Sequence, residues 1–447
     1  MADPHRTYEI RCPVHGFIPI NDWERDIINH NVFQRLRRIR QPAWTDYVYP
    51  GAMHTRFEHS LGVMHLATKL YDSIVARSGD LLKDFYGYDD AGFKRDKVLV
   101  RLAALLHDVG HGPFSHAGED VFPLRKDGKN RYVHEEYSAA IIRKLLKNVI
   151  EQHPLNRNYG FLADDIASLI EGSSNSSCRI FWREIITGQM DADRMDYLLR
   201  DSLHAGVDYG KYDWRRLLNT VVAVEMPQPE GETAKQGLRL GITEGGVHAA
   251  EGLILARYFM FTQVYFHKTR VAYDHHLRRA LSKLLPTGEF PALHADDDEK
   301  IKANIEEYIT WDDWKVVGML TDGYGGEHGE RLRRRNHYRE IYNTPECPGQ
   351  EDLDELKNVE DKVQEYIIAK EQASKSWYKV DETDIPVLIN EEMGKVTPLS
   401  RQSAVVASVR ATRRVSLFAV PEKAQEARAK VSDLIQSNPP RTKPRTN

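Results

Sequence analysis

Residues 98–116 read VLVRLAALLHDVGHGPFSH and join an apolar segment to a cluster of histidines. Residues 98–106 are apolar except for Arg101, a pattern that predicts a central, largely buried helix. The doublet His107-Asp108 ends that helix, so both side chains start at the edge of a low-dielectric core. An ionised carboxylate buried there without a partner is strongly disfavoured. A divalent cation bound by both residues removes that cost, so the doublet predicts a metal site.

Two further segments place imidazoles and carboxylates where local structure does not require them. They are residues 54–59, HTRFEH, and residues 191–201, DADRMDYLLRD. A lone histidine is more often an ordinary hydrogen-bonded residue, but a His-Asp doublet followed by two more histidines favours metal binding. Two histidines and two aspartates around one divalent ion give a site that is neutral overall, and these N and O ligands suit Fe, Mn, Co, Ni, Zn or Mg.

Apolar residues recur at three- and four-residue steps through most of residues 57–285, which predicts helices. The clearest helical segments are residues 60–75, 98–106, 137–150, 190–201 and 246–285, the last with one break, preceded by shorter ones at 23–28 and 32–40. A strand and turn are expected near residues 16–20. The region 292–358 is acidic and loop-rich, with helical pieces such as 301–314.

The C-terminal third changes period. Residues 385–389 and 414–420 have strand patterns, and residues 422–436 have the pattern of a closing helix. The sequence therefore predicts a mainly α fold in four parts: an N-terminal segment (1–50), a catalytic helical core (51–290), a small α+β C-terminal region (291–436) and a Pro-rich, basic tail (437–447) that is expected to be disordered.

Composition limits the function. The net charge of -4 argues against a dedicated nucleic-acid-binding protein, although it permits a local basic pocket for a small polyanion. The 3 cysteines are far apart and form no CxxC pattern, which is typical of free thiols in a reducing compartment. No apolar run is long enough to span a membrane and no signal peptide is visible, so a cytoplasmic protein without membrane contact is expected.

Three motifs together resemble a known family. They are HTRFEHSLG at 54–62, ALLHDVGHGPFSH at 104–116 and DADRMDYLLRD at 191–201. In this order they resemble the signature of HD-domain proteins and, more narrowly, of the deoxynucleoside triphosphate triphosphohydrolases, a likeness that covers residues 10–285. Some members of that group carry a sterile-alpha-motif domain, which has no counterpart in these residues. The resemblance implies hydrolysis of deoxynucleoside triphosphates (dNTPs) to deoxynucleoside and tripolyphosphate.

The resemblance also implies the metal ligands. Position by position, they fall on His59, His107, Asp108 and Asp193. Asp191 and Asp196 compete for the last place. Helical spacing favours Asp193, because it shares one face with Tyr197 and Asp201. Asp191 and Asp196 are expected to be a helix cap or a solvated carboxylate.

Four further residues are expected to serve catalysis and phosphate binding: His111, His116, Glu119 and His134. His116 and Glu119 are three residues apart, so on a helix the carboxylate can orient the imidazole. His134 is a second candidate acid, and its alternative is an ordinary residue at a helix start. The family usually has Asp at the position of Glu119.

The resemblance implies the contacts to a dNTP. The triphosphate is implied to contact Arg56, Arg194, Tyr197, Arg257 and Lys268, and the sugar is implied to contact Gln41, Asp201 and Tyr265. Guanidinium groups match phosphate geometry, although each cation alone would suggest a surface salt bridge. Gln41 and Asp201 are implied to bind the 3′-hydroxyl, and Tyr265 to close over C2′ and disfavour ribonucleotides. A Mg ion is expected to accompany the triphosphate.

Many relatives are oligomers activated by nucleotides bound between subunits, so a homodimer or homotetramer with a nucleotide activator is expected. Gln34 and Arg37 resemble such an activator contact, and the alternative is a surface helix with the arginine stripe Arg35, Arg37, Arg38 and Arg40. Asn29 stands where the vertebrate enzyme has an Asp that binds guanine. An amide cannot accept from both guanine donors, which argues against a guanine-specific activator.

Two other functions fit the same metal site. One is an HD phosphohydrolase of different specificity, such as a nucleoside monophosphatase or a cyclic-nucleotide phosphodiesterase. The other is a non-catalytic nucleotide sensor. The complete ligand set and the cationic residues favour the triphosphohydrolase.

Overall fold

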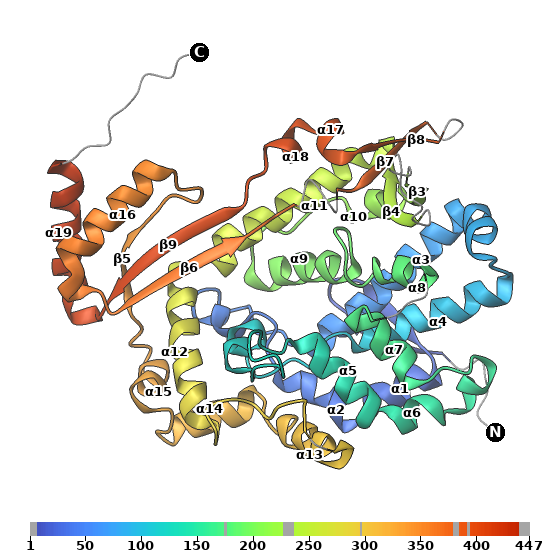
Figure 1. Ribbon diagram of the computed structural model, residues 1–447, viewed down its shortest axis with the longest axis horizontal. Helices are drawn as coiled ribbons and strands as arrows, with labels where there is room; N and C mark the ends of the chain where they lie inside the picture. Colours follow the sequence, from blue (N-terminus) through green and yellow to red (C-terminus); the bar gives the residue numbers. More distant parts are fainter. Residues whose placement is uncertain are drawn as a thin grey trace.

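Three long helices form the centre of the molecule: α3 (Arg56–Tyr86), α4 (Asp90–Leu106) and α9 (Ala192–Ala205). The helix α3 packs against both others (Figure 1). The apolar end of α4 is fully buried, as its sequence predicts, and Arg101 is neutralised by Glu24, whose Oε1 lies 2.7 Å from the arginine Nε. The computed structural model describes residues 7–173, 177–226, 237–295, 297–378, 384–390 and 394–437.

Shorter helices surround this centre. They are α1 (Asp22–Asn29), α2 (Asn31–Gln34), α5 (His134–Lys144), α6 (Lys147–Glu151), α7 (Ala163–Glu171), α8 (Ser177–Arg183), α10 (Trp214–Leu218), α11 (Val247–Phe259), α12 (Lys268–Leu284), α13 (Asp298–Tyr308), α14 (Asp313–Thr321) and α15 (Gly326–Arg333). The chain is mainly α-helical, which confirms the predicted fold class. Among the described residues, no helix has the length and apolar character needed to cross a membrane.

The strands form three small sheets. An N-terminal antiparallel hairpin pairs β1 (Tyr8–Cys12) with β2 (Gly16–Ile20). A second sheet has the order β3 (Val221–Glu225), β4 (Leu238–Thr243), β7 (Pro386–Asn390) and β8 (Lys395–Pro398), in which β4 and β7 are parallel. In the third, β9 (Thr412–Ala419) lies between β5 (Arg339–Asn343) and β6 (Ala369–Lys375). Two short helices, α17 (Leu399–Gln402) and α18 (Ala404–Ser408), join β8 to β9.

A C-terminal unit has a hydrophobic core of its own. The helices α16 (Gln350–Val363) and α19 (Ala424–Ser437) pack with the third sheet around Leu356, Leu417 and Ala427. Figure 1 shows this unit at one side of the helical body, with β6 and β9 running back toward α11. By contrast, α13, α14 and α15 contribute to the main core, so the region expected at 291–436 is divided between two cores.

The structure corrects several predicted elements. The expected helix at 32–40 is the short α2 followed by a 3₁₀ turn, and the expected helix at 137–150 is broken between α5 and α6. The segment 301–314 is divided because the side chain of Asp312 caps the start of α14. The strands β3 and β4 were not predicted within the helical region. The tail at 438–447 lies outside the described residues.

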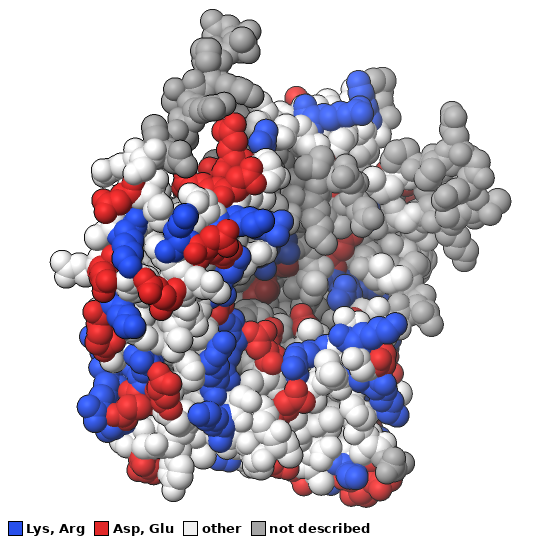
Figure 2. All heavy atoms as spheres, turned by 60° about the vertical axis from the view of Figure 1, so that its left-hand side comes forward, with Lys and Arg blue, Asp and Glu red and all other residues white. Residues whose placement is uncertain are grey.

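Charge is mixed on the face that Figure 2 shows. Lys and Arg side chains alternate with Asp and Glu side chains over the described residues of that face. A nucleic-acid backbone needs a continuous cationic surface. The described part of this face therefore does not present one.

The loop after α4 is held in a strained conformation. Phe114 and Ser115 have positive φ angles of 59° and 57°, which L-residues rarely adopt. The amide of Phe114 donates to Oδ1 of Asp313 over 2.7 Å, and the amide of Arg40 donates to Oδ2 of the same carboxylate over 2.8 Å. The ring of Phe114 also stacks on Trp44 at 4.6 Å. These contacts, drawn from three separate segments, fix the loop.

Burial makes Asp313 a source of pH-dependent stability. Burial raises the pKa of its carboxyl from 3.8 to about 7. Between these two pH values the carboxyl ionises in the unfolded state but stays protonated in the folded state. Ionisation therefore favours unfolding, and the stability that this group contributes falls as pH rises from about 4 to about 7. The loss is at most about 4 kcal/mol, since one pKa unit is worth about 1.4 kcal/mol.

We therefore expect Asp313→Asn to flatten the pH dependence of thermal unfolding. The wild-type melting temperature should fall more between about pH 5 and pH 8 than that of the variant, although the amide loses one hydrogen bond and lowers stability at every pH. Asp322→Asn, at the exposed end of the same helix, serves as the control. Parallel pH profiles for all three proteins would contradict this role.

Candidate metal centre and catalytic residues

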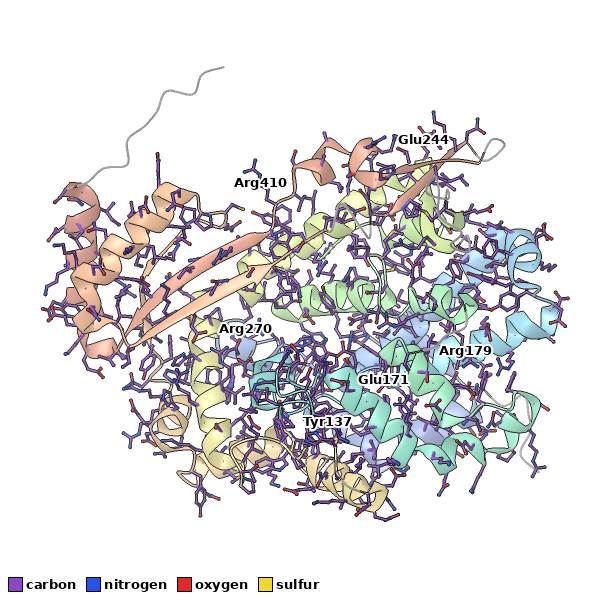
Figure 3. All side chains as sticks on the ribbon, in the orientation of Figure 1. Tyr137, Glu171, Arg179, Glu244, Arg270 and Arg410 are labelled. Carbon is purple, nitrogen blue, oxygen red and sulfur yellow. The ribbon has the colours of Figure 1, made fainter. Side chains whose placement is uncertain are left out.

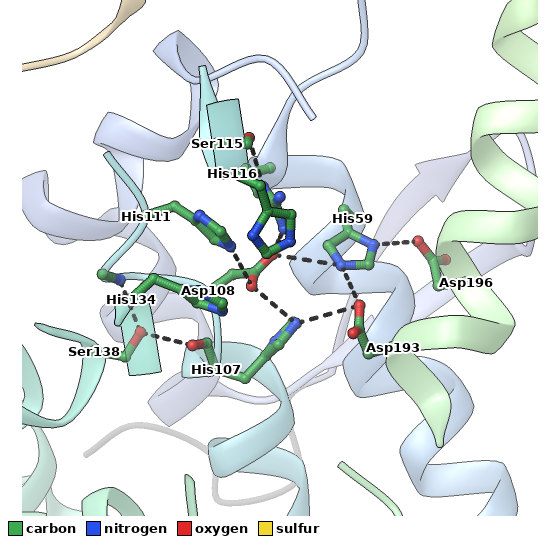
Figure 4. Close-up of polar contacts among 12 residues, drawn as sticks. His59, His107, Asp108, His111, Ser115, His116, His134, Ser138, Asp193 and Asp196 are labelled. Carbon is green, nitrogen blue, oxygen red and sulfur yellow. Dashed lines mark hydrogen bonds and ion pairs between the residues drawn. The ribbon is translucent and has the colours of Figure 1, made fainter. Parts of the chain in front are cut away.

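Four predicted ligands from three distant parts of the chain meet at one point (Figure 4). His59 lies in the first turn of α3, His107 and Asp108 follow α4, and Asp193 lies in the first turn of α9. The Nε2 of His59 is 3.0 Å from Oδ1 of Asp193 and 3.4 Å from Oδ2 of Asp108. The Nε2 of His107 is 3.3 Å from Oδ1 of Asp108 and 3.8 Å from Oδ1 of Asp193. The side chain of Asp193 remains 34% exposed, which leaves one side of the group open.

The imidazoles are oriented as metal ligands. The Nδ1 of His107 lies 2.8 Å from the carbonyl of Ala104, which can only accept, so Nδ1 carries the hydrogen and Nε2 a lone pair. The Nδ1 of His59 lies 2.8 Å from Oδ2 of Asp196, an arrangement that leaves its Nε2 facing the group. The Nε2 of His107 is buried without a hydrogen-bond partner. A divalent cation fits this set, because it would satisfy that nitrogen and the two carboxylates together.

His59 is surrounded by negative charge. Burial lowers its pKa, but hydrogen bonds with Asp193 and Asp196 outweigh burial and raise the pKa to about 10. Without a metal the imidazole is therefore protonated on both nitrogens, and metal binding would release one of these protons.

A buried layer supports the ligands and corrects one expectation. Asp196, expected to be a solvated carboxylate, is fully buried, and its oxygens contact His59, Arg200 and His15. The Nε2 of His15, in the turn of the β1–β2 hairpin, lies 2.6 Å from Oδ1 of Asp196. Asp191 caps α9, as helical spacing predicts. Nothing in the local sequence marked His15, because its partner is 181 residues away.

The four predicted catalytic residues form a second cluster beside the metal ligands. Oε1 of Glu119 lies 2.9 Å from Nδ1 of His116 and 2.8 Å from Nδ1 of His134. The ring of His111 stacks on that of His134 at 3.8 Å, and its Nε2 lies 3.3 Å from Oδ1 of Asp108. One carboxylate therefore orients two imidazoles, and His111 connects them to the metal ligands.

Charge within this cluster is unevenly divided. Burial lowers the pKa of His134, but Glu119 outweighs it and raises the pKa to about 9. Burial raises the pKa of Glu119, yet His116 and His134 hold it well below its usual range. Burial, with Arg56 and His134 nearby, lowers the pKa of His111 well below its usual range. At neutral pH, Glu119 is therefore ionised, His134 protonated and His111 neutral.

The predicted triphosphate contacts differ in their surroundings. Arg56 is buried and donates to Oδ2 of Asp108 over 2.5 Å. Arg257 is buried, donates to the carbonyl of Trp377 over 2.9 Å, and has an Nε without a partner. The ring of Tyr197 lies 6.4 Å from that of Tyr265. Lys268 is exposed and forms no ion pair with the other predicted residues within the described part of the chain.

Arg194 also lines a cavity of about 630 Å³. The cavity is lined by three further arginines, Arg179, Arg183 and Arg239. Arg179, which Figure 3 shows on the opposite side of the body from the C-terminal unit, is paired with Asp165 at 2.7 Å. The metal ligands do not line this cavity. Arg194, which lines this cavity, directly follows the predicted metal ligand Asp193 in the sequence.

The predicted sugar residues are connected through His54. Asp201 is buried, with Oδ1 2.6 Å from Nε2 of His54 and Oδ2 accepting from the hydroxyl of Tyr265. The backbone N–H of Gln41 donates to the backbone carbonyl of His54 over 3.0 Å, and the side-chain Oε1 of Gln41 is buried without a partner. An unpaired buried carbonyl and an oriented carboxylate can both accept from a ligand hydroxyl.

Comparison with protein families agrees with this geometry. The HD domain model matches residues 56–201, which hold all four predicted metal ligands, and the model of an HD associated region matches residues 212–443. The chain belongs to the HD-domain phosphohydrolases.

Similar proteins extend this assignment. An uncharacterized protein of Bacillus subtilis is 30% identical over 95% of this chain and 96% of its own length. A deoxynucleoside triphosphate triphosphohydrolase SAMHD1 homolog of Dictyostelium discoideum is 38% identical, but the match covers 43% of this chain and 35% of that protein. A hypothetical protein from Aquifex aeolicus has a solved structure with a TM-score of 0.74, 26% identity and coverage of 95% of this chain and 100% of that chain.

The residues of the expected activator contact lie beside the HD core. Asn29 ends α1 and is exposed. Gln34 accepts from Nε of Arg37 over 2.9 Å, and Arg37 lies over the ring of Phe57 at 3.4 Å. Arg35, expected on a surface stripe, is instead buried and donates to the carbonyl of Trp311. An activator role for Asn29, Gln34 and Arg37 stays a prediction.

The geometry of the site predicts that substitution of Asp193 and of Asp196 lowers metal affinity to different extents. Asp193→Asn should abolish binding of one divalent ion, because it removes a ligand. Asp196→Asn should weaken binding about 10- to 100-fold, because the amide no longer orients His59 as an ionised carboxylate does. Titration of the apo protein with Mn²⁺ or Co²⁺, followed calorimetrically, measures both, with the exposed Asp208→Asn as control. Metal affinity equal to wild type in Asp193→Asn would refute this ligand set.

Proposed function

We propose that this HD phosphohydrolase hydrolyses dNTPs to deoxynucleoside and intact tripolyphosphate. One observation carries the proposal: an imidazole cluster oriented by Glu119 contacts the proposed metal ligands through His111 and Asp108, and Asp193 shares helix α9 with Tyr197 and Asp201, which are suited to a phosphate and a sugar. The Dictyostelium discoideum relative bears the same activity in its name, which supports the proposal over the HD region.

The ligand set would hold one divalent ion through His59, His107, Asp108 and Asp193. Such an ion acts as a Lewis acid on a phosphoryl oxygen. Arg56 donates to Asp108, and its guanidinium can also form a hydrogen bond with the same phosphoryl group. These residues would therefore bind the α-phosphate, where the reaction takes place.

His134 is the proposed general acid. Its side chain is 12% exposed, whereas that of His116 is 63% exposed, so His134 is better shielded from solvent. Because Glu119 engages Nδ1, the protonated Nε2 remains free to donate. Water adds to the α-phosphorus and loses a proton to the solvent, the bond from phosphorus to the 5′-oxygen breaks, and His134 gives that oxygen its proton. The products are a 5′-hydroxyl and tripolyphosphate.

Sugar selection is assigned to Asp201, Gln41 and Tyr265. The hydrogen bond from Tyr265 to Asp201 fixes the aromatic ring beside the carboxylate. A 3′-hydroxyl can donate its one hydrogen either to Asp201 or to the unpaired carbonyl of Gln41. A ring held in that place leaves little room for a 2′-hydroxyl, which accounts for selection of deoxyribose.

The function is tested by product analysis. Purified protein is incubated with each of the four dNTPs, singly and mixed, in Mg²⁺, Mn²⁺ or Co²⁺, and products are separated by ion-exchange chromatography. We expect equimolar deoxynucleoside and tripolyphosphate. His134→Gln, expected to lower turnover about 10²- to 10⁴-fold, excludes a contaminating phosphatase. Stepwise release of orthophosphate would instead identify a phosphohydrolase of another specificity.

Sugar selection is tested at Tyr265. Tyr265→Ala should lower the ratio of kcat/KM for a dNTP over the matching ribonucleotide at least about 10-fold, because the ring no longer excludes the 2′-hydroxyl. Tyr265→Phe keeps the ring and should keep most of that ratio. An unchanged ratio in Tyr265→Ala would remove the steric role.

A further inference from the structure

The end of strand β6 is fixed against the helix that carries Arg257. Trp377, two residues beyond β6, is buried, and its ring lies 5.3 Å from that of Phe261 and 5.5 Å from that of Tyr258. Its carbonyl accepts from Nη1 of Arg257. The C-terminal unit is therefore attached to the helical body beside a predicted triphosphate contact.

This attachment places Lys375, the last residue of β6, next to the active site. Its ammonium lies 5.1 Å from the centre of the Phe261 ring, and that ring lies 4.8 Å from the ring of Tyr265. Tyr265 in turn donates to Asp201. A continuous row of side chains therefore connects Lys375 with the proposed sugar pocket.

Lys375 has cationic neighbours and no carboxylate partner among the described residues. Another lysine of the same strand, Lys370, pairs with Glu360, but Lys375 forms no ion pair there. Burial, together with Arg257 and Arg194, lowers the pKa of Lys375 to about 8, while Asp193 and Glu119 act in the opposite direction.

Cations that outnumber their carboxylate partners are unfavourable in a partly buried site. Arg257 likewise has no carboxylate partner in the described part of the chain, and Arg194 is 3.6 Å from Asp191. A bound polyanion would remove the repulsion and supply acceptors for all three cations.

We propose that Lys375 binds the polyphosphate of the substrate, so that the HD-associated C-terminal region completes a phosphate site otherwise built by the HD core. The inference rests on the proposed function, because a triphosphate is the ligand with enough charge to engage Arg194, Arg257 and Lys375 together. It also assigns the C-terminal unit a part in substrate binding.

Calorimetric binding of inorganic tripolyphosphate to the full-length, metal-replete chain tests this role. Lys375→Gln should weaken binding roughly 10- to 100-fold, the range expected for a charge-assisted hydrogen bond. Lys375→Arg keeps the charge and should bind within about 5-fold of wild type, by the same reasoning. Lys370→Gln, on the same strand and outside the site, should be unchanged. In dNTP hydrolysis, Lys375→Gln should raise KM more than it lowers kcat.

Two results separate this inference from the proposed function. If tripolyphosphate binds Lys375→Gln and wild type equally, the inference is overturned even where the wild type hydrolyses dNTPs. If the wild type binds tripolyphosphate through Lys375 but hydrolyses no dNTP, the phosphate site is supported and the proposed reaction fails. Matching melting temperatures of the variants and wild type exclude misfolding as the cause of weaker binding.

Discussion

The structure depends on one electrostatic constraint: ionisable groups are gathered at the buried end of an apolar helix. Asp108 is 2% exposed and contacts Arg56, His59, His107 and His111 at 2.5–3.4 Å. In such a place, uncompensated charge would destabilise the fold. Compensation by neighbouring cations, and by a divalent ion in the proposed reaction, makes the same groups useful for binding phosphate. Fold stability and metal chemistry therefore share one solution.

That solution draws on every part of the chain. The N-terminal hairpin supplies His15, which contacts Asp196 behind the metal ligand His59. The helix α14 supplies Asp313, which holds the strained loop between His111 and His116. The C-terminal unit reaches the same region through Trp377. An HD core alone would contain the ligands but would lack several of the contacts that fix their orientation.

Much of the fold and of the candidate site could be predicted from the sequence, because the signals were local. The apolar run before His107, the spacing of His116 and Glu119, and the cap at Asp191 all involve residues within one or two helical turns. The strands β3 and β4 were missed; β3 pairs only with β4, and the pairing of β4 with β7 joins residues more than 140 positions apart. Arg35 was misjudged for a similar reason, since its burial depends on Trp311.

The sequence by itself determined the family, the mainly helical class and the residue types of a metal site, since composition and short spacing carry that information. Only the tertiary structure decided that Asp196 and His15 stand behind His59, that Glu119 serves two imidazoles, and that Lys375 lies over the ring of Phe261. These relations join residues that are 15 to 181 positions apart. Their distances follow from how the helices and strands pack, which no local pattern specifies.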